Sequence, residues 1–140
     1  MSEINRTKIF AGRFESLAHI DEFARVFADE AGFNTETVYL IETAVDEACS
    51  NIIEHAYEGQ ENGEIECSLA ADDQCLTVIL KDRGISFDPT KVKKPDINAA
   101  LKKRKDHGVG LFMIRKIMDE VHFKTNSTDG NVLTMVKLRV

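Results

Sequence analysis

The sequence predicts an α+β fold, a two-layer sandwich in which helices pack on one face of a mixed, largely antiparallel β-sheet. Three observations favour it. Two segments within the first 57 residues repeat apolar side chains at helical spacing. Two pairs of short strand-like segments follow, each pair joined by a polar turn. With 140 residues and 43% hydrophobic content, the chain is long enough for one domain, residues 1–140, with a single sizeable core.

The first half of the chain contains a strand signal and two helix signals. Residues 8–14 are predicted to form a strand. Ser16 can cap a first helix that ends at Gly32, and a second helix is expected over residues 35–57. The apolar stripe of the first helix comprises Leu17, Ile20, Phe23, Ala24 and Phe27. The buried stripe of the second helix comprises Ile41, Val45, Ala48 and Ile52.

The second half contributes most of the predicted sheet. Residues 64–70 and 76–81 are predicted to form strands that are joined by the polar turn 71–74. A short helix is expected over residues 109–118. The last strands are expected near residues 121–125 and 132–140, and the dipeptide Asp129-Gly130 between them is a strong hairpin signal.

Composition and charge exclude several classes of protein. The formal net charge of −6 argues against a protein that coats nucleic acid or an anionic membrane. No apolar run is long enough to span a bilayer, and the polar residues 1–8 lack the apolar core of a signal peptide. Cys49, Cys67 and Cys75 are odd in number and lack Cys-x-x-Cys spacing. We therefore expect reduced, mostly packed thiols in a cytoplasmic protein.

Residues 86–107 form an unusually long stretch without a helix or strand signal, and loops of this length in compact domains are usually functional or disordered. The stretch holds seven of the 18 basic residues: Lys91, Lys93, Lys94, Lys102, Lys103, Arg104 and Lys105. A basic loop in an acidic protein suggests an anionic ligand, and a nucleoside triphosphate fits. A solvated charge run is the alternative interpretation, and the glycines that follow the stretch favour the ligand.

The most informative motif is Glu47 followed four residues later by Asn51, a spacing that places both side chains on one helix face. A carboxylate can accept a proton from a hydroxyl group, and a carboxamide oxygen is a suitable ligand for Mg²⁺. Two glycine signals follow, DRGISFDP at residues 82–89 and HGVGL at residues 107–111. Glycines that open a helix let backbone N–H groups approach a phosphate closely. The order of the three motifs therefore predicts a nucleotide site.

Together the motifs resemble the GHKL superfamily of ATP-binding domains with the Bergerat fold, and in particular its small stand-alone serine kinases that act as anti-sigma factors. Residues 47–51 resemble the N-box of that superfamily. Residues 82–89 resemble its first glycine box, and residues 107–114 its second. Ser86 stands where many members have a second glycine, although the F-D-P that follows is typical of the anti-sigma branch.

The resemblance implies roles for particular residues. Glu47 would be the general base that deprotonates a substrate serine, and Asn51 would bind the Mg²⁺ that accompanies ATP. Asp82 would accept a hydrogen bond from the adenine amino group, and Gly84 would let the backbone pass close to the base. The other nucleotide-binding residues would be Phe87, His107, Gly108, Val109, Gly110 and Leu111, with residues 86–107 as an ATP lid. His55, two turns from Glu47, would either touch the site or lie on the helix surface without a role.

The resemblance also implies a function. The protein would be an ATP-dependent serine/threonine protein kinase that phosphorylates a serine on a STAS-type anti-sigma-factor antagonist. It would also sequester a sigma factor, as a homodimer, without direct contact to nucleic acid or a membrane. The alternative is an ATP-binding regulatory module that controls a partner without phosphoryl transfer. Taken singly, Glu47 could be an exposed helix acid, and Gly84 and Gly110 could serve only a turn and a helix start.

Overall fold

The computed structural model describes residues 3–60, 63–85 and 113–139. In chain order these residues form β1 (Ile4–Ala11), a 3-10 turn η1 (Phe14–Ser16), α1 (Leu17–Glu30), α2 (Thr35–Asn51), a π-helical turn η2 (Ile52–Ala56), β2 (Glu64–Ala71), β3 (Cys75–Asp82), β4 (Glu120–Ser127) and β5 (Gly130–Leu138). Residues 113–117 are helical as well, which agrees with the helix predicted over residues 109–118 for the part that is described.

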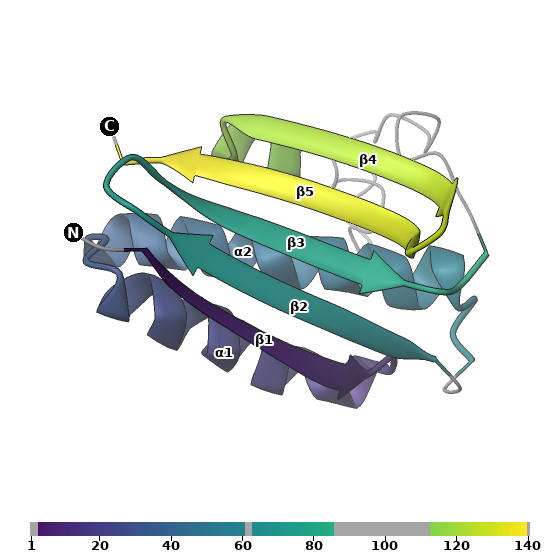
Figure 1. The fold of residues 1–140 in the computed structure, drawn as a ribbon. Helices are drawn as coiled ribbons and strands as arrows, with labels where there is room; N and C mark the ends of the chain where they lie inside the picture. The colour runs from purple at the N-terminus through teal and green to yellow at the C-terminus, as the bar shows by residue number, and fades with distance from the viewer. Residues whose placement is uncertain (1–2, 61–62, 86–112, 140) are drawn as a thin grey trace.

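The five strands form one sheet in the order β1-β2-β3-β5-β4, and every pairing is antiparallel. Helices α1 and α2 lie side by side behind one face of this sheet (Figure 1). The predicted α+β class and its two layers are confirmed. The strand order places β3 at the centre of the sheet, so the carboxyl end of β3 is held by neighbours on both sides.

The core lies between the helices and the inner face of the sheet. Strands β2 and β3 alternate buried and partly exposed residues, as expected for strands with one covered face. The predicted helix stripes are confirmed, because Ile20 and Phe27 of α1 and Ile41 and Val45 of α2 are buried. Complete burial of side chains of this size stabilises the fold by about 1.5–3 kcal/mol each. This packing fixes the position of α2 against the sheet.

The structure differs from the sequence prediction at several element ends. Strand β1 stops at Ala11 and not at residue 14, because the chain enters the 3-10 turn that leads into α1. Ser16 precedes α1 but makes no side-chain capping bond, whereas the Asn34 side chain caps α2 by accepting from the Thr37 N–H at 2.8 Å. The hairpin turn consists of residues 128 and 129, and Gly130 opens β5 with a positive φ of 85°.

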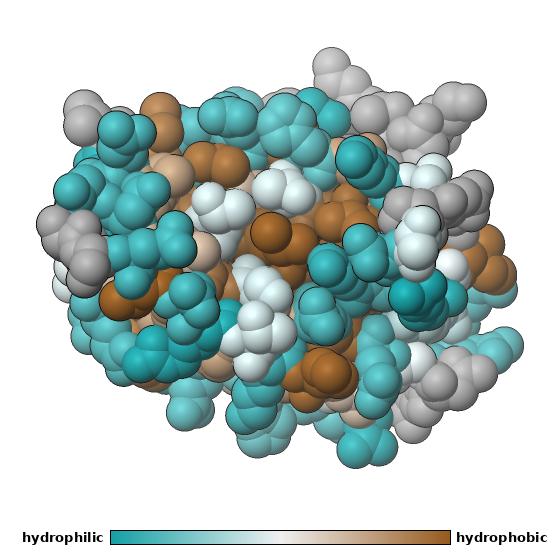
Figure 2. Space-filling model, in the orientation of Figure 1, coloured by the Kyte–Doolittle hydropathy of each residue, from teal (hydrophilic) through white to brown (hydrophobic). Residues whose placement is uncertain are grey.

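The other face of the sheet carries no helix among the described residues, and Figure 2 views the molecule from that side. Apolar and near-neutral residues gather in the middle of this face, and hydrophilic residues lie mostly around them (Figure 2). Ile9 and Leu138 are exposed on this side, and Ile79, Val132 and Val136 are partly exposed. The helices of the described residues include none with the length and apolar character needed to cross a membrane.

Candidate functional site

Helix α2 and the end of strand β3 supply the described residues of the predicted site. Glu47 and Asn51 lie in the last turns of α2, where Glu47 is partly exposed and Asn51 is buried with 8% of its surface accessible. Asp82 is the last residue of β3, and Gly84 follows two residues later. Burial raises the pKa of the Cys49 thiol, Cys67, Asp21 and Asp46 raise it further, and Asp82 is close enough to this part of α2 to add a small rise. The two predicted motifs therefore lie close together.

Asn51 has the character of a ligand to a cation. Its Oδ1 atom is buried and accepts no hydrogen bond from any described residue. A buried carbonyl oxygen without a donor costs about 1–3 kcal/mol, so native proteins rarely leave one without a partner. A hard cation such as Mg²⁺ takes carboxamide oxygens as ligands. The orphaned oxygen of Asn51 therefore fits the Mg²⁺ that the sequence prediction assigned to it.

A π-helical turn follows Asn51 directly. In this turn the N–H of Tyr57 donates to the carbonyl of Ile52, five residues earlier, at 3.0 Å. The carbonyl oxygen of Ala56 accepts a hydrogen bond from the N–H of Ile85, beyond β3, at 2.7 Å. Single π turns inside helices occur frequently at functional sites. Here the widened turn joins the helix that carries Glu47 and Asn51 to the segment after Asp82.

Asp82 is buried, with 3% of its surface accessible, and one of its two carboxylate oxygens is already bonded. Oδ1 accepts from the N–H of Gly84 at 2.9 Å and from Nδ2 of Asn131 at 2.9 Å. Burial raises the pKa of this carboxyl group, and the two hydrogen bonds oppose the rise. Within the described parts of the chain Oδ2 accepts no hydrogen bond, so it can accept one from an amino group of a ligand.

Asn131 is a site residue that the sequence prediction missed. Its Nδ2 donates to Gly84 O at 3.1 Å as well as to Asp82, so it joins both ends of the turn. Asn131 lies opposite Asp82 in the pairing of β3 with β5. The motifs contain no signal for this register, because it depends on which strands become neighbours.

Gly84 occupies a position that has no space for a side chain. A Cβ atom there would lie 2.5 Å from the carbonyl oxygen of Ala56 and 2.7 Å from the Ala56 Cβ. The prediction was that Gly84 lets the backbone pass close to the adenine base. In the structure, the backbone of Gly84 lies close to the helix end at Ala56. A larger residue would push this helix end away from the turn.

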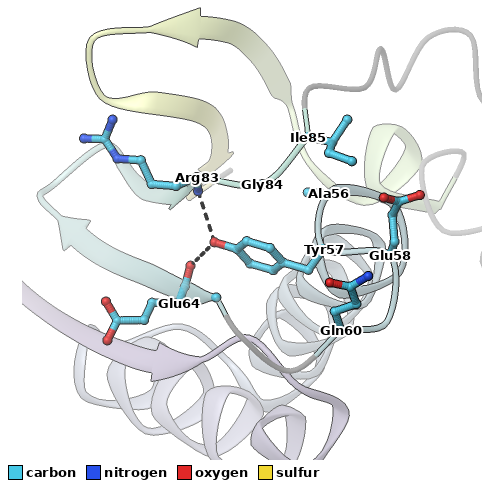
Figure 3. Close-up of a pocket in the computed structure, with 9 residues that line it drawn as sticks. Ala56, Tyr57, Glu58, Gln60, Glu64, Arg83, Gly84 and Ile85 are labelled. Atoms are coloured by element: carbon cyan, nitrogen blue, oxygen red, sulfur yellow. Dashed lines mark hydrogen bonds between the residues drawn. The ribbon is translucent and has the colours of Figure 1, made fainter.

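A cavity of about 670 Å³ lies beside this turn (Figure 3). Its described lining consists of Ala56, Tyr57, Glu58, Gln60, Gly63, Glu64, Arg83, Gly84 and Ile85. The cavity shares Gly84 with the predicted site. Glu47, Asn51 and Asp82 are not among its described lining residues, so the cavity borders the predicted site without containing its reactive groups.

The remaining predicted site residues lie outside the described residues. They are Phe87, His107, Gly108, Val109, Gly110 and Leu111, together with the predicted lid at residues 86–107. His55 is described, and it is partly buried in η2. Cys49 and Cys67 are buried free thiols, and Cys75 is a partly buried one.

Comparisons with known proteins agree with the fold. A family model described as a histidine kinase-like ATPase domain matches residues 10–137. The serine-protein kinase RsbW of Oceanobacillus iheyensis is 33% identical, over 79% of this chain and 71% of the relative. The proteins of the same name from Halalkalibacterium halodurans and Bacillus cereus are 33% and 30% identical, each over 79% of this chain, and 68% and 69% of their own lengths are covered.

Proposed function

Because the chain belongs to the histidine kinase-like ATPase family, we propose that it is an ATP-dependent kinase that phosphorylates a serine of a partner protein. The proposal rests mainly on two polar side chains, one on α2 and one at the end of β3, that can each bind a different part of Mg-ATP. Among the described residues, the buried oxygen of Asn51 has no hydrogen-bond donor, and one carboxylate oxygen of Asp82 accepts no hydrogen bond. The first suits the Mg²⁺ of Mg-ATP, and the second suits the adenine amino group.

The proposed reaction assigns a task to each described residue. Glu47, one turn before Asn51, accepts the proton of the serine hydroxyl. The serine oxygen forms a bond to the γ-phosphorus while the bond from that phosphorus to the β-phosphate oxygen breaks, and ADP leaves. When bound, Mg²⁺ neutralises charge on the phosphate oxygens. Asp82 and Gly84 hold the base, and we propose residues 86–107 as the lid over the phosphates.

The proposed substrate is the serine of a STAS-type anti-sigma-factor antagonist, and the proposed second partner is a sigma factor that the protein sequesters. The support is the similarity to serine-protein kinases RsbW over most of their length. We also propose that residues 1–140 act as one domain and assemble as a homodimer. Light scattering at micromolar concentration tests the dimer, and a strict monomer with and without nucleotide would contradict it.

The kinase proposal is tested by weighing the antagonist after incubation with the protein, ATP and Mg²⁺. We expect one added phosphate, located on a serine. The variant Glu47→Gln keeps the size of the side chain but removes the base, so phosphorylation should fall by about 10²–10⁴-fold while ATP affinity stays unchanged. The matched control is Glu36→Gln, an exposed acid in the first turn of α2.

Two outcomes would contradict the kinase proposal in different ways. A Glu47→Gln protein that phosphorylates at the wild-type rate would show that Glu47 is not the base. A wild-type protein that binds Mg-ATP and its partner but transfers no phosphate would favour the alternative, a nucleotide-binding regulator that acts by association alone.

A further inference from the structure

Tyr57 lies at the junction of the two predicted motifs, although no motif includes it. It follows η2 directly, and only 9% of its surface is accessible. Its N–H belongs to the π turn, whereas its side chain extends from the helix end toward the sheet (Figure 3). The residue therefore connects the helix of Glu47 and Asn51 with the strand ends near Asp82.

The ring of Tyr57 occupies a slot between two glycines. A Cβ atom on Gly12 would lie 2.8 Å from the ring, and a Cβ atom on Gly63 would collide with it. The slot is closed by a hydrogen bond of 2.7 Å from the N–H of Gly12 to the carbonyl of Gly63. Side chains at either position would displace the ring, so the two glycines fix where the hydroxyl group lies.

The hydroxyl group of Tyr57 is hydrogen-bonded as donor and as acceptor. It donates to the carbonyl of Glu64, the first residue of β2, at 2.6 Å. It accepts from the N–H of Arg83 at 3.0 Å (Figure 3). The Arg83 N–H belongs to the peptide that links Arg83 to Asp82. A peptide plane held in this way constrains the backbone dihedrals of the residues on both sides of it.

We propose that Tyr57 is a positioning residue for the adenine base: its hydroxyl group orients the Asp82–Gly84 turn so that Oδ2 of Asp82 faces the adenine amino group. The inference rests on the proposed nucleotide site and extends it to a residue outside the motifs. Asn131 holds Oδ1 from the side of β5, and Tyr57 holds the peptide from the side of the helix. The two contacts together define the direction of the carboxylate.

The test compares two nucleotides that differ only in the 6-amino group, to which Asp82 would be hydrogen-bonded. Calorimetry with Mg²⁺ measures Kd for ADP and for purine riboside 5′-diphosphate, which lacks the 6-amino group. Wild-type protein should prefer ADP by about tenfold or more, because only ADP can donate a hydrogen bond from the 6-amino group to the charged carboxylate of Asp82. In Tyr57→Phe the ring remains in its slot and only the hydroxyl group is lost. The preference for ADP should then fall by about tenfold.

A purely structural role for Tyr57 would give a different result. It would lower the melting temperature and leave the ratio of the two Kd values unchanged, and an unchanged ratio would overturn the proposal. The matched control is Tyr39→Phe, since Tyr39 is the only other tyrosine and lies exposed on α2. This control should keep the wild-type ratio.

A second measurement uses wild-type protein alone and so does not depend on the folding of a variant. The Arg83 amide hydrogen, which is bonded to Tyr57, should exchange more slowly when ADP is bound, and unchanged exchange would overturn the inference. If wild-type protein binds neither ADP nor ATP, the proposed function fails and the inference fails with it. If wild-type protein binds ADP and only the ratio test fails, the proposed function stands and the role of Tyr57 is wrong.

Discussion

The N–H of Ile85 donates to the carbonyl oxygen of Ala56 at 2.7 Å, and this bond joins the first glycine box to the end of the helix that carries the N-box. The two motifs are about thirty residues apart in sequence, yet the helix end five residues after Asn51 is hydrogen-bonded to the backbone of the glycine box. The contact is possible because Ala56 is the last residue of η2, where carbonyl groups have no donor within the helix, and because Gly84 has no side chain. Binding of the base and of the phosphates is therefore expected to depend on one shared junction.

The junction predicts the effect of Gly84→Ala. The added methyl group would lie 2.5 Å from the Ala56 carbonyl oxygen, so the turn and the helix end must separate. Overpacking of this kind costs about 1–3 kcal/mol, and ADP affinity measured by calorimetry should fall by about tenfold or more. Gly59→Ala is the contrasting control. Gly59 has a positive φ of 76° and open space around it, so alanine there should lower stability and leave ADP affinity intact. Equal affinities for both variants would contradict the prediction.

Asp82→Asn should weaken ADP binding while leaving the fold nearly as stable. The asparagine oxygen can still accept from Gly84 N–H and from Asn131, but its amide group then points a donor at the adenine amino group. We expect Kd for ADP to rise by about tenfold or more. Asp73→Asn, on the exposed turn between β2 and β3, is the control. Calorimetry that gives an unchanged Kd for Asp82→Asn would remove Asp82 from the site.

Asn51→Leu should raise the stability of the protein and abolish its binding of Mg-ADP. The change removes a buried oxygen for which the described part of the chain supplies no donor, so the nucleotide-free protein should gain about 1 kcal/mol of unfolding free energy in urea. Binding of Mg-ADP should be lost, because leucine offers no ligand to Mg²⁺. The asparagine that caps α2 provides the contrast: Asn34→Ala should lose about 1 kcal/mol and keep Mg-ADP binding. An Asn51→Leu protein that is less stable, or that still binds Mg-ADP, would contradict this assignment.

The sequence predicts those parts of the fold that are encoded locally. The apolar spacing of residues 35–57 predicts a helix, and the helical region spans Thr35 to Ala56. The strand segments were placed within a few residues, except that β1 starts four residues earlier than expected. The position of Glu47 and Asn51 on one helix face follows from their spacing alone. None of these features needs knowledge of which strands become neighbours.

The remaining features of the site are non-local, and this is why the sequence does not predict them. Asn131 reaches Asp82 only because β5 pairs with β3, and Tyr57 reaches Arg83 only because the helix end packs over both strand ends. Gly12 and Gly63 have a role only once the Tyr57 ring lies between them. The π turn has no propensity signal of its own, since its residues form an ordinary apolar helix pattern.

A carboxyl pair outside the motifs predicts how stability depends on pH. Asp21 of α1 has a buried Oδ1 atom that accepts no hydrogen bond from the described residues. Its pKa is raised to about 8, first by burial and then by a hydrogen bond and repulsion from Asp46 of α2. Glu42 adds repulsion, and Arg25, which also forms an ion pair with Glu42 at 3.2 Å, opposes the rise.

The folded protein therefore binds a proton at Asp21 that the unfolded chain releases near pH 4, so the contribution of this group to stability is greatest below that pH and falls as the pH rises toward 8. Asp21→Asn keeps the shape of the protonated carboxyl group without a titrating proton, and it should remove this slope. Because the site is partly exposed, we expect a gain of about 1 kcal/mol at pH 8 and little change near pH 5. Urea unfolding at both pH values measures the effect, with Glu22→Gln, the exposed neighbour on α1, as the control. If Asp21→Asn and wild-type protein lose stability equally between pH 5 and pH 8, the pair does not hold the proton.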